Sequence, residues 1–483
     1  MKIPDKGLPK ESIFNTLQSY KGQDLDWQSG QVLGFIYDAG KEVHDVSHEA
    51  YTMYLTENAL DPLSFPSLLR LENEVVRMTA NLLDCNSDVV GNFTSGGTES
   101  LILAVKTARD YSRALKPHIK EPEMVLRITA HSSLFKACHY LGIKPVVTRV
   151  HDDTFKADVA AMRAAISANT ILLVGSAPSY AHGVVDPITE IASLAKEKDL
   201  LCHVDACVGG IHLSYMRKLG FDVPDFTLNV PGVTSLSVDL HKYGYAPKGA
   251  SIVLHKNKEL RKYQIWGCSR WTGYPVINAA ITSAKSGGPM AAAWAVLNYL
   301  GDHGYKKIVQ EVMAATQLMI EGIDRIDGLR VLGQPDMCMF ALASSTDKIN
   351  IYHLAEEMKK SGWYLQPQFA RENSPANLHI SLNRSTVPKA KAFLEDFEKT
   401  VEEIKHGEVD RQILDLQAEL KKLSLEYDDE TFFKLAEMAG VTGTEPPENM
   451  EKVNMLLEAL PYDISEYVMV EFMNNMMDTG KSQ

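Results

Sequence analysis

Six short apolar runs, separated by segments with helical periodicity, restrict the fold of this chain more than any other feature. The runs are rich in Val, Leu and Ile, which is typical of strands buried on both faces. Such strands belong to a mostly parallel sheet with helices on both sides, so the sequence predicts an α/β fold. The runs are MVLRITA (124–130), PVVTRV (145–150), TILLVGSA (170–177), LLCHVDA (200–206), SLSVDLH (235–241) and ASIVLHK (250–256).

Changes of pattern along the 483 residues predict four regions. The first is polar and broken, with one helical stretch near 41–54. After the apolar runs, helices over 289–300 and 304–325 lead into the short apolar segments GLRVLG, MCMFALA and LHISL. The predicted regions are an N-terminal arm (1–60), a large domain (61–287), a smaller α+β domain (288–405) and a helical C-terminal extension (406–483).

Charge and cysteine usage indicate the kind of partner and compartment. The net charge of −13 argues against nucleic acid as the main partner, and it does not by itself select a small-molecule substrate. The six cysteines form no CxxC pair and are typical of buried thiols in a reducing compartment. The N-terminal residues lack the apolar region of a signal peptide, and no apolar run reaches the ~18 residues of a membrane span. We therefore expect a cytoplasmic protein.

Two charged residues follow buried strands and suggest cofactor chemistry. Lys242 comes directly after SLSVDLH and before a glycine-containing segment. A lysine that attacks a carbonyl needs a dry pocket in which its amine can be neutral, and the end of a buried strand supplies one. Asp205 ends LLCHVDA, where a buried carboxylate needs a cationic partner such as a protonated pyridine nitrogen. The alternatives are a solvated lysine and an aspartate that caps a turn.

A loop of small residues and a histidine also follow predicted strands. Ser95-Gly96-Gly97-Thr98 precedes a predicted helix, where backbone N–H groups can bind a phosphate, although Ser95 or Thr98 could instead be a simple N-cap. His131 follows another strand and could lie flat on an aromatic ring, or have a purely structural role. Ligands bind at the carboxyl ends of the strands in open α/β sheets, so these residues are predicted to share one site.

Four motifs resemble those of one enzyme superfamily. The segments TSGGTES, SYAHGVVDP, HVDACVGG and SVDLHKYGYAPKG are similar to the pyridoxal-phosphate group II decarboxylase superfamily, and most similar to its sphingosine-1-phosphate lyases. The resemblance extends over about residues 55–405. It implies a type I aminotransferase-like fold, pyridoxal 5′-phosphate (PLP) as the cofactor, and a homodimer with active sites at the interface between the two copies.

The resemblance also implies a role for each motif residue. Lys242 would form the Schiff base with PLP, Asp205 would pair with the pyridine nitrogen, and His131 would stack on the ring. The remaining implied site residues are Gly97, Thr98 and His241 at the cofactor phosphate, Lys248 at the anionic head group of the substrate, and Ser237 beside the cofactor.

The substrate half of the pattern departs from the family. Asp61 stands where the family has a histidine that contacts the substrate phosphate, and Ile277 replaces an aromatic residue. The family stretch Arg-Pro-Gly-Gly reads Lys285-Ser-Gly-Gly here. An ionised Asp61 would repel a phosphate, so we expect inefficient use of sphingosine 1-phosphate, although Asp61 could instead cap a turn before Pro62.

The pattern leaves the reaction open between two bond cleavages. The leading hypothesis is an aldehyde-lyase that cleaves the Cα–Cβ bond of an amino alcohol, and the alternative is a decarboxylase that releases CO2 from an amino acid. An inactive scaffold protein would not need both Lys242 and Asp205. An aminotransferase would need an arginine for the α-carboxylate, for which Arg384 is the candidate.

Overall fold

The large domain contains a seven-stranded, mostly parallel sheet, as predicted. The computed structural model describes residues 2–406, 429–441, 447 and 449–478. Strands β2 to β6 are parallel to one another, while β7 pairs antiparallel with both β6 and β1. The strand order is β1-β7-β6-β5-β4-β2-β3. The strands are β1 (Val90–Thr94), β2 (Glu123–Arg127), β3 (Lys144–Thr148), β4 (Thr170–Ser176), β5 (Leu201–Asp205), β6 (Ser235–Asp239) and β7 (Ser251–His255).

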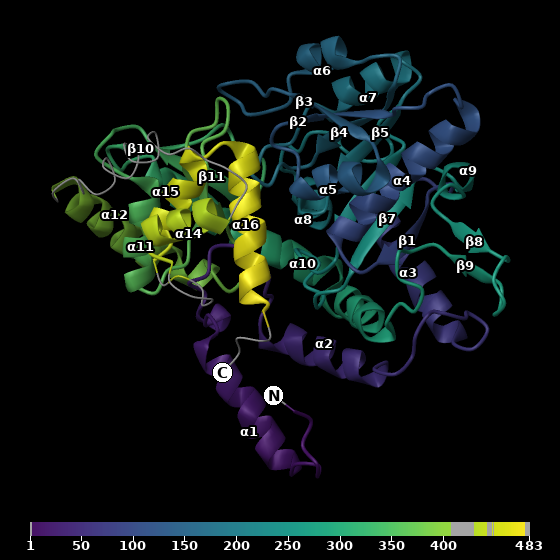
Figure 1. The fold of residues 1–483 in the computed structure, drawn as a ribbon, viewed down its shortest axis with the longest axis horizontal. Coiled ribbons are helices and arrows are strands. Elements are labelled where there is room, and N and C mark those ends of the chain that lie inside the picture. Colours follow the sequence, from purple (N-terminus) through teal and green to yellow (C-terminus); the bar gives the residue numbers. More distant parts are fainter. Residues whose placement is uncertain (1, 407–428, 442–446, 448, 479–483) are drawn as a thin grey trace.

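Helices cover both faces of this sheet (Figure 1). Every residue of β4, β5, β6 and β7 is buried, which explains why these strands are rich in Val, Leu and Ile. The covering helices are α3 (Pro66–Leu82), α4 (Gly97–Leu115), α5 (Ser132–Leu141), α6 (Val159–Ala165), α7 (Ile188–Glu197), α8 (Gly209–Lys218) and the short α9 (Lys258–Arg261).

One long helix leads from the large domain into the small one. Helix α10 (Gly287–Ile323) is interrupted at Gly301, whose φ of 53° is non-helical. The sequence predicts this interruption as two helices, 289–300 and 304–325. The helix packs along α2 (Lys41–Met53) of the N-terminal region and against α3 and α8.

The smaller α+β domain contains a four-stranded antiparallel sheet in the order β10-β11-β13-β12. Its elements are β10 (Leu329–Val331), β11 (Met339–Ser344), α11 (Ile351–Lys360), β12 (Gln366–Gln368), β13 (Asn377–Ser381), the 3₁₀ turn η3 (Val387–Lys389) and α12 (Ala390–His406). Three further helices, α14 (Asp429–Met438), α15 (Glu451–Ala459) and α16 (Tyr462–Met476), pack on this domain through an apolar cluster that includes Tyr352 of α11 (Figure 1). The boundaries predicted between the four regions remain predictions.

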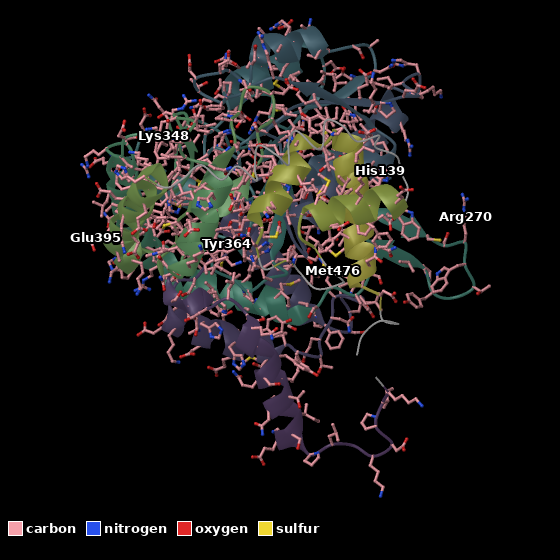
Figure 2. All side chains as sticks on the ribbon, turned by 60° about the vertical axis from the view of Figure 1, so that its left-hand side comes forward. His139, Arg270, Lys348, Tyr364, Glu395 and Met476 are labelled. Atoms are coloured by element: carbon pink, nitrogen blue, oxygen red, sulfur yellow. The ribbon has the colours of Figure 1, made fainter. Side chains whose placement is uncertain are left out.

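Two segments extend away from the body. Helix α1 (Lys10–Tyr20) buries none of its residues, and two 3₁₀ turns, η1 (Lys21–Gln23) and η2 (Trp27–Ser29), connect it to α2. Strands β8 (Trp266–Cys268) and β9 (Val276–Asn278) form a separate hairpin, and Figure 2 shows Arg270 at its outer end. Within the described residues, none of the helices is both long and apolar enough to cross a membrane.

Candidate active site

A cavity of about 370 Å³ opens at the carboxyl ends of the large-domain strands. Its walls come from the loop after β1, the start of α5, and the segments that follow β4, β5 and β6. Six of the predicted site residues line it together, namely Gly97, Thr98, His131, Asp205, His241 and Lys242. Residues far apart in the sequence therefore converge at the sheet edge where ligands bind in open α/β folds.

Lys242 forms an ion pair that the motif analysis does not include. Its Nζ lies 3.0 Å from Oδ2 of Asp239, the last residue of β6, whose side chain is only 2% exposed. Burial opposes the charge on Lys242, but the Asp239 carboxylate outweighs it and raises the pKa of the lysine above its ordinary value. Asp239 stands in the motif SVDLHK, three residues before the lysine at the end of the same buried strand, and a carboxylate at that place is the signal that could have identified it.

Asp205 is held by its neighbours on the sheet. Its Oδ1 accepts hydrogen bonds from the backbone N–H of Cys207 at 3.1 Å and from Ser237 Oγ at 3.5 Å. Ser237 does not line the cavity; it lies beneath, and its hydroxyl also contacts His203 Nε2 at 3.3 Å. Among the described residues no cation pairs with Asp205, so its carboxylate can receive a cationic group of a ligand.

The loop before α4 is shaped by contact with Asp239. A Cβ at Gly97 would come within 2.7 and 2.9 Å of the two Asp239 oxygens, so only glycine fits. The Thr98 hydroxyl lies 2.8 Å from that of Ser133. Within the described structure, Asp239 Oδ1 and His241 Nδ1 are buried polar atoms without a hydrogen-bond partner. Such orphaned atoms beside a helix N-terminus fit a bound polar ligand.

His131 lies somewhat differently from the prediction. Strand β2 ends at Arg127, and a turn closed by the Ala130 N–H to the Arg127 carbonyl separates it from His131. His131 caps α5, with Nδ1 accepting from Ser133 N at 3.2 Å. Burial is the main cause that lowers its pKa, so the ring is neutral at pH 7 and still faces the cavity.

Lys248 lies outside the walls of the cavity. Its Nζ is 5.1 Å from the centre of the Tyr37 ring. Although Lys248 is exposed on the single chain, burial by nearby protein and the charge of Lys242 lower its pKa. None of the described acidic residues forms an ion pair with it.

The residues that depart from the family pattern have local contacts of their own. Asp61 accepts hydrogen bonds at 2.8 Å from Leu63 N and from Ser64 Oγ, so it caps a turn. These bonds lower its pKa and keep it ionised at neutral pH. Lys285 pairs with Glu72 at 2.6 Å and is not available to a substrate, and Ile277 is 76% exposed on the hairpin.

Arg384 is also engaged elsewhere. Its Nη1 donates to the carbonyl of Ala39 at 2.8 Å, and its Nε lies 3.9 Å from Glu311. Since Arg384 does not line the cavity, the structure gives no support to its role as the carboxylate-binding arginine of an aminotransferase.

Comparison with known protein families places this site in a known context. Residues 72–362 match the family of class-V aminotransferases, and residues 411–475 match a putative helix-turn-helix domain found at the C-terminus of pyridoxal-dependent enzymes. The second match covers α14, α15 and most of α16, and part of it lies outside the described residues.

Comparison with individual proteins identifies the same family. A sphingosine-1-phosphate lyase of Oryza sativa is 40% identical over 84% of this chain and 75% of its own length. A probable L-aspartate decarboxylase of Pyrococcus abyssi is 34% identical over 75% of this chain and 91% of its own. The solved structure of the Burkholderia pseudomallei sphingosine-1-phosphate lyase superimposes with a TM-score of 0.80 at 33% identity, covering 84% of this chain and 93% of that one. The chain therefore belongs to the class-V aminotransferase family, in the group that contains the sphingosine-1-phosphate lyases, and it is a PLP-dependent lyase.

Proposed function

We propose that the cavity holds PLP through the residues that the motifs indicate. Lys242 is the covalent attachment point, Asp205 pairs with the pyridine nitrogen, and His131 covers the ring. Gly97, Thr98 and His241 bind the phosphate, supported by the orphaned His241 Nδ1 and by the start of α4. When bound, PLP supplies an electron sink for cleavage of a bond at the α-carbon of an amine.

Within this site each side chain has a distinct task. Ser237 and the Cys207 N–H fix Asp205 in orientation, so that its charge is directed at the ring nitrogen. Asp239 holds the proton of Lys242 before attachment and then faces the same pocket. The neutral His131 packs against the ring without adding charge. These side chains therefore orient the cofactor ring, and Asp239 holds a proton on Lys242 Nζ.

For the reaction, we propose an aldehyde-lyase that cleaves the Cα–Cβ bond of a phosphorylated amino alcohol. The observation that carries this choice is Lys248, a cation near the cavity without an acidic partner among the described side chains. Burial is the main cause that lowers the pKa of Lys248, and repulsion by the charge of Lys242 lowers it further. An anionic head group placed near them would relieve this repulsion.

The substrate test compares products as well as rates. We expect the PLP-loaded protein to release an aldehyde from sphingosine 1-phosphate, slowly because the ionised Asp61 opposes the phosphate, and Lys248→Ala to raise KM for it more than KM for an unphosphorylated amino alcohol. Lys262→Ala is the control, because Lys262 pairs with the exposed Glu259 on α9 and does not line the cavity. A Lys248→Ala enzyme with unchanged KM for the phosphorylated substrate would contradict the proposed role.

Decarboxylation is the second candidate, favoured by the likeness to the Pyrococcus abyssi protein along most of that protein's length. Release of CO2 from an amino acid such as aspartate, with no aldehyde from any amino alcohol, would replace the first proposal by this one.

We also propose that the active form is a homodimer that binds small-molecule amines and does not bind nucleic acid. The hairpin segment 266–281 carries five exposed large apolar side chains, which a partner would cover. They are Trp266, Trp271, Tyr274, Ile277 and Ile281. Sedimentation showing an active monomer would refute the dimer.

All six cysteines are free thiols, which supports a cytoplasmic location.

A further inference from the structure

The carboxylate of Glu99 joins two segments that are far apart in the sequence. Glu99 lies in the first turn of α4 and is only 6% exposed. Its Oε2 accepts from Ser95 N at 2.6 Å and from Ser95 Oγ at 2.7 Å, while Oε1 accepts from Ile281 N at 2.6 Å. One buried carboxylate thus binds both the loop that would hold the PLP phosphate and the end of the 266–281 hairpin segment.

The hairpin segment has few other attachments to the body. Strands β8 and β9 pair with each other, from Trp266 opposite Asn278 to Cys268 opposite Val276. Near the base, Gln264 Nε2 donates to the Ala279 carbonyl at 2.6 Å. The outer end with Arg270 extends away from the rest of the molecule (Figure 2). The Glu99 contact is therefore a main link between this segment and the large domain.

The charge of the surrounding chain suits a second copy as the partner of the hairpin segment. The hairpin segment 266–281 contains a single charged side chain, Arg270, although the chain as a whole carries −13. An apolar, aromatic arm with one positive charge and no negative charge is better matched to another copy of this acidic protein than to a basic partner. This argument rests on the homodimer proposed above.

We propose that Glu99 is a positioning residue that couples docking of the hairpin segment on a second copy to the affinity of the loop at 95–98 for the PLP phosphate. Glu99 accepts the hydrogen bonds that the Ser95 N–H and hydroxyl can donate. The N–H groups of Gly97 and Thr98 are then the ones that face a phosphate. A movement of the Ile281 backbone turns the Glu99 carboxylate, and the same carboxylate moves Ser95. Docking that fixes Ile281 therefore fixes the loop in its phosphate-binding shape.

Coupling of this kind is reciprocal, because each binding event stabilises the state that the other requires. PLP should then lower the dissociation constant of the dimer by about tenfold for a coupling of ordinary size, and most of such a change falls on the dissociation rate. The rate is measured on the full chain, from the exchange of subunits between two differently labelled populations, with and without PLP. This readout does not depend on turnover of any substrate.

The decisive variant is Glu99→Gln, whose amide nitrogen cannot accept a hydrogen bond. We expect it to fold and to bind PLP about tenfold more weakly in an absorbance titration. PLP should then change its subunit exchange by less than about twofold. Glu259→Gln is the matched control, because Glu259 is exposed and pairs only with Lys262 among the described side chains. Its exchange should respond to PLP as in the wild type.

A second variant keeps the test decisive if Glu99→Gln does not fold. Ile281→Pro removes the backbone N–H that donates a hydrogen bond to Glu99 Oε1, and it leaves the carboxylate in place. It should lose the effect of PLP on exchange in the same way. A Glu99→Gln or Ile281→Pro protein that keeps the full wild-type response would overturn the coupling. A wild-type chain that is monomeric at every concentration would refute both the proposed dimer and the coupling. Failure to cleave amino alcohols would refute the proposed reaction while leaving the coupling intact.

Discussion

Replacing Asp239 by asparagine should make Lys242 far more reactive as a nucleophile before PLP is attached. In the wild type, Asp239 Oδ2 lies 3.0 Å from Lys242 Nζ, and both side chains are largely buried. The carboxylate favours the protonated amine, which cannot attack a carbonyl. Asparagine has nearly the same shape but no charge, so burial still lowers the pKa of Lys242 while the largest opposing charge is lost; only weaker opposing influences, among them Asp205, remain.

The size of the effect follows from the distance. Two unit charges at 3.0 Å interact by about 5.5 kcal/mol at an effective dielectric of about 20. Since a factor of ten corresponds to about 1.4 kcal/mol, complete loss of this interaction would change the neutral fraction of Lys242 by about four powers of ten. His241 shares the Asp239 carboxylate at 3.6 Å, and the Lys242 side chain is 17% exposed, so solvent screens part of the interaction. We therefore expect an increase of at least about a hundredfold at pH 8.

The assay is trace acetylation of the PLP-free protein at several pH values, with the label on Lys242 quantified by mass spectrometry. Asp302→Asn is the control, because Asp302 lies at the same 3.0 Å distance from Lys218 but its side chain is 59% exposed. Solvent screening should limit the change at Lys218 to a few-fold. If Asp239→Asn folds normally and Lys242 changes by less than about threefold, the ion pair does not control this lysine.

Three further changes test other parts of the structure. Lys242→Ala should yield a colourless protein without turnover, whereas Asp205→Ala should retain some PLP but lose most activity; absorbance and product assays check both, and a yellow, active Lys242→Ala protein would exclude Lys242 as the attachment point. Asp61→His should raise kcat/KM for sphingosine 1-phosphate, because the ionised carboxylate repels the phosphate; a fast wild type that histidine does not improve would show that Asp61 only caps its turn. The Glu451 carboxylate raises the pKa of His353. Stability from a raised histidine pKa is complete below the unfolded value of about 6.5 and disappears as pH rises through the folded value. The loss of Tm in His353→Asn should therefore be larger at pH 6 than at pH 9, and a loss independent of pH would contradict this origin.

The parallel sheet could be predicted because its signal is local. Each strand from β4 to β7 is buried on both faces, so its sequence alone identifies it. Strand β12 contains only three residues including Pro367, and β8 and β9 are equally short and partly exposed. Such strands exist because a neighbour pairs with them, and a single sequence carries little sign of that pairing.

The site could be predicted only as far as its motifs extend. Lys242 and Asp205 stand out because a charge after a buried strand needs an explanation. Asp239 and Glu99 act through partners on other segments, Gly97 and Ile281, whose proximity is a property of the fold. The same applies to Lys285, whose pairing with Glu72 removes it from the substrate side.

The position of β1 in the sheet has a consequence for synthesis of the protein. β1 is hydrogen-bonded to β7 in the described sheet, with Val90 opposite His255. More than 150 residues of chain lie between the two strands. A nascent chain that has not yet reached β7 must carry β1 as an unpaired strand, and unpaired edges promote aggregation. Since the Gly97 loop follows β1 and packs on Asp239 at the end of β6, this loop also completes its shape only late in synthesis. Ribosome-bound fragments that end before Ser251 should therefore depend on chaperones, and PLP can stabilise the chain only after β7 has emerged.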